Sequence, residues 1–166
     1  MVPVEALAKT PMFRGLSDKH LEAIAEISQR QVFETGATIF LEGQPAVYTF
    51  ILEDGKVALE MKIQLEPNQP PRHTIIDVLF PGDPFAWSAF VEPYTLMLSA
   101  RCITRATVIA VNAAELRQLL AADCVLGYAI MQRQTQVMSR RLHDTRAQLI
   151  GEHGLALMGD SLRYSA

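Results

Sequence analysis

Between residues 30 and 111 the sequence consists of short β-rich runs separated by turns, and this pattern limits the possible folds most strongly. Alternating apolar residues are typical of half-buried strands, and Gly, Pro, Asn and Asp occupy the segments between them. The pair Asp54 and Gly55 predicts a hairpin, because glycine tolerates a positive φ. Turns that recur about every eight to twelve residues indicate an antiparallel sandwich or barrel. The predicted strands are 38–41, 47–52, 57–61, 74–80, 96–103 and 106–111.

Helical periodicity flanks this β-rich region on both sides. Ser17 is a favourable N-cap for a first short helix. Asn112, with Glu115 three residues later, resembles a capping box, and Asp123 is a candidate cap for the longest helix. That helix is predicted over residues 125–150, ending at Gly151, with a length of about 39 Å.

A stripe of apolar residues runs along the long helix at alternating steps of three and four, with two threonines in it. Such a stripe is typical of a coiled-coil seam. The helix either lies on its own barrel or pairs with a second copy. We favour a homodimer, because the seam is continuous and narrow and two-fold pairing is the commonest solution. The seam residues are Tyr128, Met131, Thr135, Met138, Leu142, Thr145 and Leu149.

Composition excludes several classes of function. The 166 residues are 49% hydrophobic, enough for one domain with a real core plus an appended element. A net charge of -3 provides no overall basic field for nucleic acid. The absence of a basic leader or a long apolar run predicts no signal peptide or membrane span, and hence a cytoplasmic protein. Two cysteines, Cys102 and Cys124, do not make a disulfide framework, and both are expected to be small core residues rather than redox centres.

Catalysis and metal binding are not expected. A metal-dependent barrel enzyme needs several histidines and a carboxylate on neighbouring strands. Only His73 lies in the β-rich region; the other histidines are His20, His143 and His153. We therefore expect a protein that is not an enzyme and has no certain cofactor.

Residues 81–90 combine a Gly-containing turn with a run, 85–90, that could form one helical turn between strands. The start of a helix presents unpaired N–H groups and partial positive charge, which favours an anion. The alternative is a tight barrel corner that binds nothing, and both interpretations remain open.

This order of elements resembles the cyclic-nucleotide-binding domain of the bacterial catabolite-activator and fumarate-regulator family. The resemblance covers residues 12–150 and rests on an ordered set of motifs. It implies a double-stranded β-helix (jelly-roll) barrel with a short N-terminal helix, a cassette helix and a long C-terminal dimerisation helix. The motifs are FRGLS at 13–17, ETG at 34–36, FIL at 50–52, GKV at 55–57, PGD at 81–83, IAV at 109–111 and MSRRL at 138–142.

In this family a Phe-Gly-Glu segment and a later Arg-Ser/Thr-Ala segment hold the nucleotide: Glu binds the ribose hydroxyl and Arg the cyclic phosphate. Phe85 matches, but Ala86 and Trp87 replace Gly and Glu, and Leu96 and Met97 replace Arg and Ser/Thr. Losing both charged anchors would cost about 3–6 kcal/mol, or two to four decades of affinity. A cyclic nucleotide would therefore bind only weakly, if at all. The resemblance implies instead a different small-molecule effector.

Other residues are candidates for contacting such an effector. Trp87 could stack on a planar ligand, cover the pocket or fill it. Arg101 could replace the missing cation if a bulge turned it inward. The family's long helix supplies a Thr to the purine, and Thr145 stands at that place, although it could instead set the dimer register. The candidate ligand-binding residues are Phe85, Ala86, Trp87, Ser88, Arg101, Arg141, Thr145 and Arg146.

Two functions are compatible with these residues. The first is a dimeric effector-sensing domain that signals to a downstream protein partner through the long helix. The second is a ligand-free protein-interaction module whose pocket is filled by side chains. The expected organisation is a sensor domain at 1–122, a dimerisation helix at 123–150 and a tail at 151–166. The tail is too short for the helix-turn-helix of family transcription factors, so no nucleic-acid partner is expected. No membrane partner is expected either, because the sequence has no long apolar run.

Overall fold

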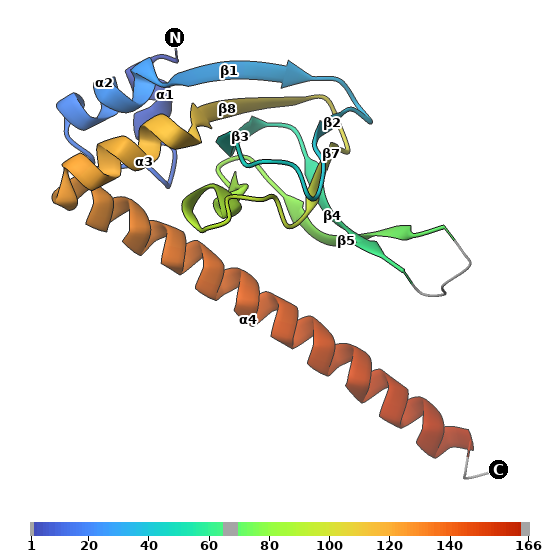
Figure 1. The fold of residues 1–166 in the computed structure, drawn as a ribbon. Coiled ribbons are helices and arrows are strands. Elements are labelled where there is room, and N and C mark those ends of the chain that lie inside the picture. The colour runs from blue at the N-terminus through green and yellow to red at the C-terminus, as the bar shows by residue number, and fades with distance from the viewer. Residues whose placement is uncertain (1, 65–69, 164–166) are drawn as a thin grey trace. The chain divides into compact units, whose positions relative to one another are not determined.

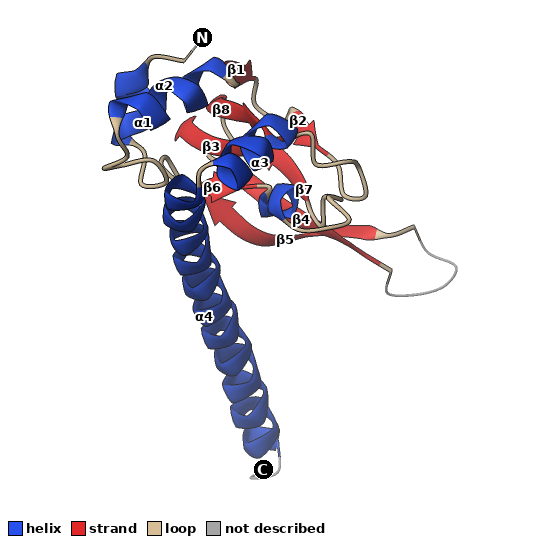
Figure 2. Ribbon diagram, turned by 60° about the vertical axis from the view of Figure 1, so that its left-hand side comes forward, coloured by secondary structure: helices blue, strands red, loops and turns tan. Residues whose placement is uncertain are grey.

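A computed structural model describes residues 2–64 and 70–163 and divides the chain into two compact units, Met1–Ile130 and Met131–Ala166. The predicted class, mainly β with flanking helices, is confirmed, and the strands of the first unit are accompanied by short helices (Figures 1 and 2). The elements, in chain order, are α1 (Val4–Lys9), α2 (Asp18–Glu26), β1 (Ser28–Phe33), β2 (Thr38–Phe40), β3 (Tyr48–Asp54), β4 (Val57–Ile63), β5 (Arg72–Leu79), β6 (Pro84–Phe85), the 3-10 helix η1 (Trp87–Phe90), β7 (Ser99–Cys102), β8 (Ala106–Asn112), α3 (Ala113–Ala122) and α4 (Cys124–Arg163).

The strands form two four-stranded antiparallel sheets, in the orders β1-β8-β3-β6 and β2-β7-β4-β5. The turn predicted at Gly55 is present, with φ of 92°, but the predicted hairpin is wrong because β3 and β4 belong to different sheets. The chain crosses between the sheets close to the start of β8: a Cβ on Gly55 would lie 2.9 Å from the Cα of Ala106. Glycine is therefore required both for its dihedral angle and for this close approach.

Strand β8 is buried on both faces and separates two apolar clusters. Val108 and Ala110 belong to the cluster between the sheets, whereas Ile109 and Val111 belong to the cluster beneath the helices. This alternation follows from the period of two in a strand. The helical cluster also contains Leu7, Leu21, Ile24, Leu116, Leu126 and Ile130.

The three predicted helix caps are confirmed. The side chains of Ser17, Asn112 and Asp123 accept hydrogen bonds from backbone N–H groups in the first turns of α2, α3 and α4. Each bond satisfies a donor that the helix itself cannot pair.

Several local predictions are wrong. Helix α4 does not end at Gly151 but continues to Arg163, because one glycine costs a helix only about 1 kcal/mol. The predicted strand at 96–103 is shorter, since β7 begins at Ser99. Cys102 is buried, which raises the pKa of its thiol, whereas Cys124 is exposed and is not a core residue. The sequence also predicts a polar, proline-rich hairpin tip at residues 67–71, and this segment lies mostly outside the described residues.

Within the described ranges, no helix has a segment both long and apolar enough to cross a bilayer.

The Asp123 cap makes stability depend on pH. Its carboxylate accepts the N–H of Leu126 and also pairs with His20 Nε2 at 3.0 Å, and these interactions lower the pKa of Asp123 below its ordinary value of 3.8. The carboxylate therefore stabilises the fold fully above that value, and this contribution is lost as the pH falls through the lowered, folded-state pKa.

We expect Asp123→Asn, which keeps a capping oxygen but loses the charge, to lower the melting temperature more at about pH 7 than at about pH 3. Thermal unfolding followed by circular dichroism measures both decreases. Asp144→Asn, which removes an equal charge from the exposed part of α4, is the control. Equal losses at the two pH values would contradict the assignment.

Candidate ligand site

The candidate site is built on the cassette, residues 81–98, which begins with a turn held against β3. Gly82 has φ of 97°, and its N–H donates to the carbonyl of Leu52 at 2.7 Å. The N–H of Leu52 in turn donates to the carbonyl of Asp83 at 3.0 Å. The Asp83 carboxylate caps the turn by accepting the N–H of Phe80 at 2.9 Å. The Pro-Gly-Asp motif thus fixes where the cassette leaves the sheet.

The helical turn predicted at 85–90 is present as η1, four residues long. Ala86 precedes it in the left-handed conformation, with φ of 61°. This conformation costs a non-glycine residue about 1–2 kcal/mol, which explains the glycine that the family pattern has at this place. So short a helix develops little of the dipole that an anion site requires.

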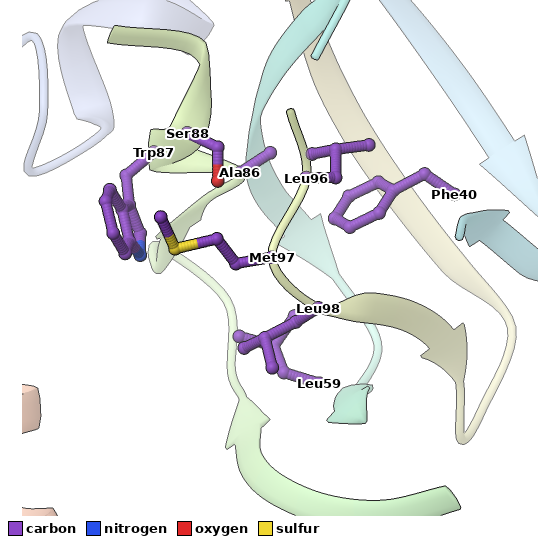
Figure 3. A pocket seen from close by; sticks show the side chains of 8 residues that line it. All are labelled: Phe40, Leu59, Ala86, Trp87, Ser88, Leu96, Met97 and Leu98. Atoms are coloured by element: carbon purple, nitrogen blue, oxygen red, sulfur yellow. The ribbon is translucent and has the colours of Figure 1, made fainter. Parts of the chain in front are cut away.

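A small pocket lies against the cassette (Figure 3). Its volume is about 40 Å³, far below the roughly 300 Å³ at which small-molecule pockets begin. The lining is mainly apolar, and its polar side-chain groups are the hydroxyl of Ser88 and the indole N–H of Trp87. The lining residues are Phe40, Leu59, Ala86, Trp87, Ser88, Leu96, Met97 and Leu98.

The two replaced anchor positions both lie in this lining. Leu96 is buried among the apolar residues, whereas Met97 is 51% exposed and lies beside the Trp87 ring. No charged side chain lines the pocket. A phosphate entering it would lose its hydration without gaining a counter-charge, which costs several kcal/mol. The lining of the pocket therefore favours a small, uncharged and mainly apolar group.

The other barrel residues predicted to bind ligand lie elsewhere. Phe85 is 1% exposed and stacks on Phe50, with ring centroids 5.1 Å apart. Arg101 is not in the lining of the cassette pocket, because it pairs with Glu60 on the outer face of the second sheet. Of the predicted residues, the structure brings together Ala86, Trp87 and Ser88.

The remaining three candidates, Arg141, Thr145 and Arg146, lie in the unit formed by residues 131–166. The Thr145 hydroxyl donates to the carbonyl of Arg141 at 2.8 Å. Thr135, the other seam threonine, makes the same bond to the carbonyl of Met131. These bonds satisfy both hydroxyls within the helix, as expected of polar seam positions.

Sequence reasoning missed Arg117, which holds the cassette from α3. Its Nη1 donates to the carbonyl of Ala89 at 2.6 Å, and its guanidinium carbon lies 4.0 Å from the centroid of the Tyr94 ring. Arg117 therefore bridges the end of η1 and the loop that returns to the barrel. An arginine next to the apolar face of α3 carries no sequence signal for this role.

Among the side chains that the structure describes, no group of three or more histidine, cysteine or acidic residues is placed to hold a metal ion.

Residues 30–123, more than half of the chain, match the family described as "Cyclic nucleotide-binding domain", so the chain belongs to this family. Its two-sheet barrel with a cassette helix and a long C-terminal helix agrees with that assignment.

A CRP-like cAMP-activated global transcriptional regulator of Mycobacterium tuberculosis is 26% identical over 145 residues, which is 87% of this chain and 61% of the regulator. A candidate cyclic nucleotide-binding protein of Geobacter metallireducens has a crystal structure with a TM-score of 0.75 and 29% identity, covering 86% of this chain and 100% of that one. The Thermus thermophilus Catabolite Activator Protein shares the fold, with a TM-score of 0.63 at 19% identity, over 84% of this chain and 62% of its own.

Replacing Arg117 should loosen the cassette. We expect Arg117→Ala to cost about 2–4 kcal/mol, from a hydrogen bond to a charged group and a cation–π contact. Hydrogen exchange of residues 86–94 should accelerate by more than the global loss of stability requires. Gln118→Ala, at an exposed position on the same helix, is the control. Cassette exchange that follows only the global stability would show that Arg117 does not position the cassette.

Proposed function

We propose that this chain is a regulatory sensor domain whose cassette pocket binds a small, uncharged and mainly apolar effector instead of a cyclic nucleotide. The family membership supports a regulatory domain of the cyclic-nucleotide-binding kind. The observation that carries the choice of effector is the pocket lining, which is apolar apart from the Ser88 hydroxyl and the indole N–H of Trp87. A hydroxyl among apolar groups favours a ligand with one polar atom.

Signalling would follow from movement of the cassette. An effector shifts the equilibrium only by its differential affinity for an open and a closed cassette. Arg117 ties the cassette to α3, and Asp123 joins α3 to α4 by capping the latter. This chain of contacts provides a route from the pocket to the beginning of α4.

The second candidate is a ligand-free interaction module, and the pocket volume of about 40 Å³ favours it specifically. In that case the side chains of Trp87, Leu96 and Met97 occupy the cassette pocket and leave no room for a ligand. Both candidates are non-enzymatic regulators that act in the cytoplasm on a downstream protein partner.

Trp87 is the only tryptophan, so its fluorescence reports the cassette. We expect no saturable change with cyclic AMP or cyclic GMP up to about 1 mM, because both charged anchors are replaced. Leu96→Arg restores one anchor and should raise cyclic AMP affinity by about tenfold or more, whereas Leu96→Gln, the uncharged control, should not. Saturable micromolar binding by the native chain would overturn the choice of effector.

Uncharged apolar probes separate the two candidates. A sensor pocket should give a saturable Trp87 response to short-chain alcohols, and Ser88→Ala should weaken that response. A ligand-free module should give no response in either form.

We further propose that the long helix pairs with that of a second copy. Several seam side chains are half-exposed, including Leu142 at 51% and Leu149 at 50%. An apolar stripe of this length is stabilised by burial against a partner helix, and two-fold pairing is the commonest arrangement.

The pairing predicts the effect of charges in the seam. Met138→Lys combined with Leu142→Lys should convert a dimer into a monomer, because two lysines per helix would be buried without partners. Ala147→Lys, on the opposite side of the heptad, should leave the dimer intact. Sedimentation equilibrium measures the mass of each variant. A native chain that sediments as a monomer would rule out the pairing.

A further inference from the structure

A second pocket, of about 330 Å³, lies on the outer face of the sheet β2-β7-β4-β5. It is several times larger than the cassette pocket and falls in the size range of small-molecule sites. Its lining is also chemically different, because charged and hydroxyl side chains surround a single aliphatic one. The lining residues are Thr38, Leu41, Glu60, His73, Ser99 and Arg101.

Two register shifts between neighbouring strands lie at residues that line this outer pocket. The pairing of β4 with β5 shifts register between Leu59 and Glu60, and that of β2 with β7 shifts between Thr38 and Phe40. Such bulges re-aim side chains and are common next to functional sites. Thr38 and Glu60 line the outer pocket, whereas Phe40 and Leu59 line the cassette pocket.

The central group of the outer pocket is the carboxylate of Glu60, whose side chain is only 7% exposed. One oxygen, Oε1, accepts both bonds from Arg101, from Nε at 2.9 Å and from Nη2 at 2.5 Å. The other oxygen, Oε2, has no hydrogen bond from any described residue. Its nearest basic group is Nδ1 of His73 at 3.9 Å, too far for a hydrogen bond. No buried side-chain oxygen among the described residues lacks a partner, so Oε2 is open to the pocket and can accept from an incoming donor.

Arg101 is only partly used by Glu60. Both of its bonds to the carboxylate leave from one edge of the guanidinium, and its side chain is 52% exposed. The Nη1 group therefore remains available to an acceptor, and guanidinium binds carboxylates well. Ser99 adds a hydroxyl whose oxygen already accepts the N–H of Glu42 at 2.9 Å, so its proton is free to be donated.

The two charges restrict the ligand. A simple anion at Arg101 would be repelled by Glu60, and a simple cation at Glu60 would be repelled by Arg101. A molecule with an ammonium and a carboxylate on neighbouring atoms satisfies both. Leu41, which is 47% exposed, provides an apolar wall for a short aliphatic side chain.

We propose that the outer pocket binds a small zwitterion of the α-amino-acid type, with its ammonium on Glu60 Oε2 and its carboxylate on the Nη1 edge of Arg101. This binding does not depend on the function proposed for the cassette pocket.

Isothermal titration calorimetry with glycine, L-alanine, L-serine and L-valine tests the proposal. At least one should bind saturably below about 10 mM, and acetate and methylammonium, the two halves of glycine, should each bind at least about tenfold more weakly. The proposal would be overturned if none of the four amino acids bound, or if acetate or methylammonium bound as tightly as the amino acids.

Variants locate the binding. Glu60→Gln and Arg101→Lys should each weaken it by about tenfold or more, since each removes a charge or the fork geometry. Arg105→Gln, which breaks the exposed pair with Glu34, should leave it unchanged. If circular dichroism shows Glu60→Gln to be unfolded, Arg101→Lys decides the question. Native affinity in a folded Arg101→Lys variant would show that the ion pair is only a structural cross-strand contact.

Discussion

The structure depends on a stack of three phenylalanine rings that joins the two sheets. Phe40 comes from β2 in one sheet, and Phe50 and Phe85 come from β3 and β6 in the other. The ring centroids are separated by 5.1–5.9 Å in every pair. Aromatic pairs at this separation add about 0.5–1.5 kcal/mol each to the burial of their area. The cassette begins at one end of this stack, and its pocket uses Phe40 as a wall.

This stack explains why the cassette can change its chemistry while the fold persists. The Pro-Gly-Asp turn and Phe85 place the chain, and neither depends on a bound charge. Leu96 and Trp87 then replace polar anchors with apolar volume, and the pocket closes around them. The result is a barrel of the cyclic-nucleotide-binding family whose pocket lining has no counter-charge for a phosphate. Membership of the family and the ligand preference that we propose therefore rest on different residues.

Sequence alone predicted the features that depend on local interactions. The caps at Ser17, Asn112 and Asp123 and the turn at Gly55 follow from residues within a few positions of each other. Sheet membership does not, because the partners of β3 are β6 and β8, which are distant in the sequence, rather than the adjacent β4. The Arg117 contact and the Glu60–Arg101 pair were missed for the same reason. The helix end predicted at Gly151 is wrong for a local reason: the low helix propensity of one glycine is outweighed by the helical residues around it.

Strand β4 contributes residues to both pockets, and this limits how the sequence of the domain can change. In β4, consecutive residues serve opposite sides, with Leu59 facing the cassette pocket and Glu60 the outer one. One residue inserted upstream in that strand would exchange their orientations. A carboxylate would then enter the apolar interior while a leucine lay among charges. An extra residue within these strands is therefore tolerated only where a bulge absorbs it, as at the two register shifts already present in this sheet.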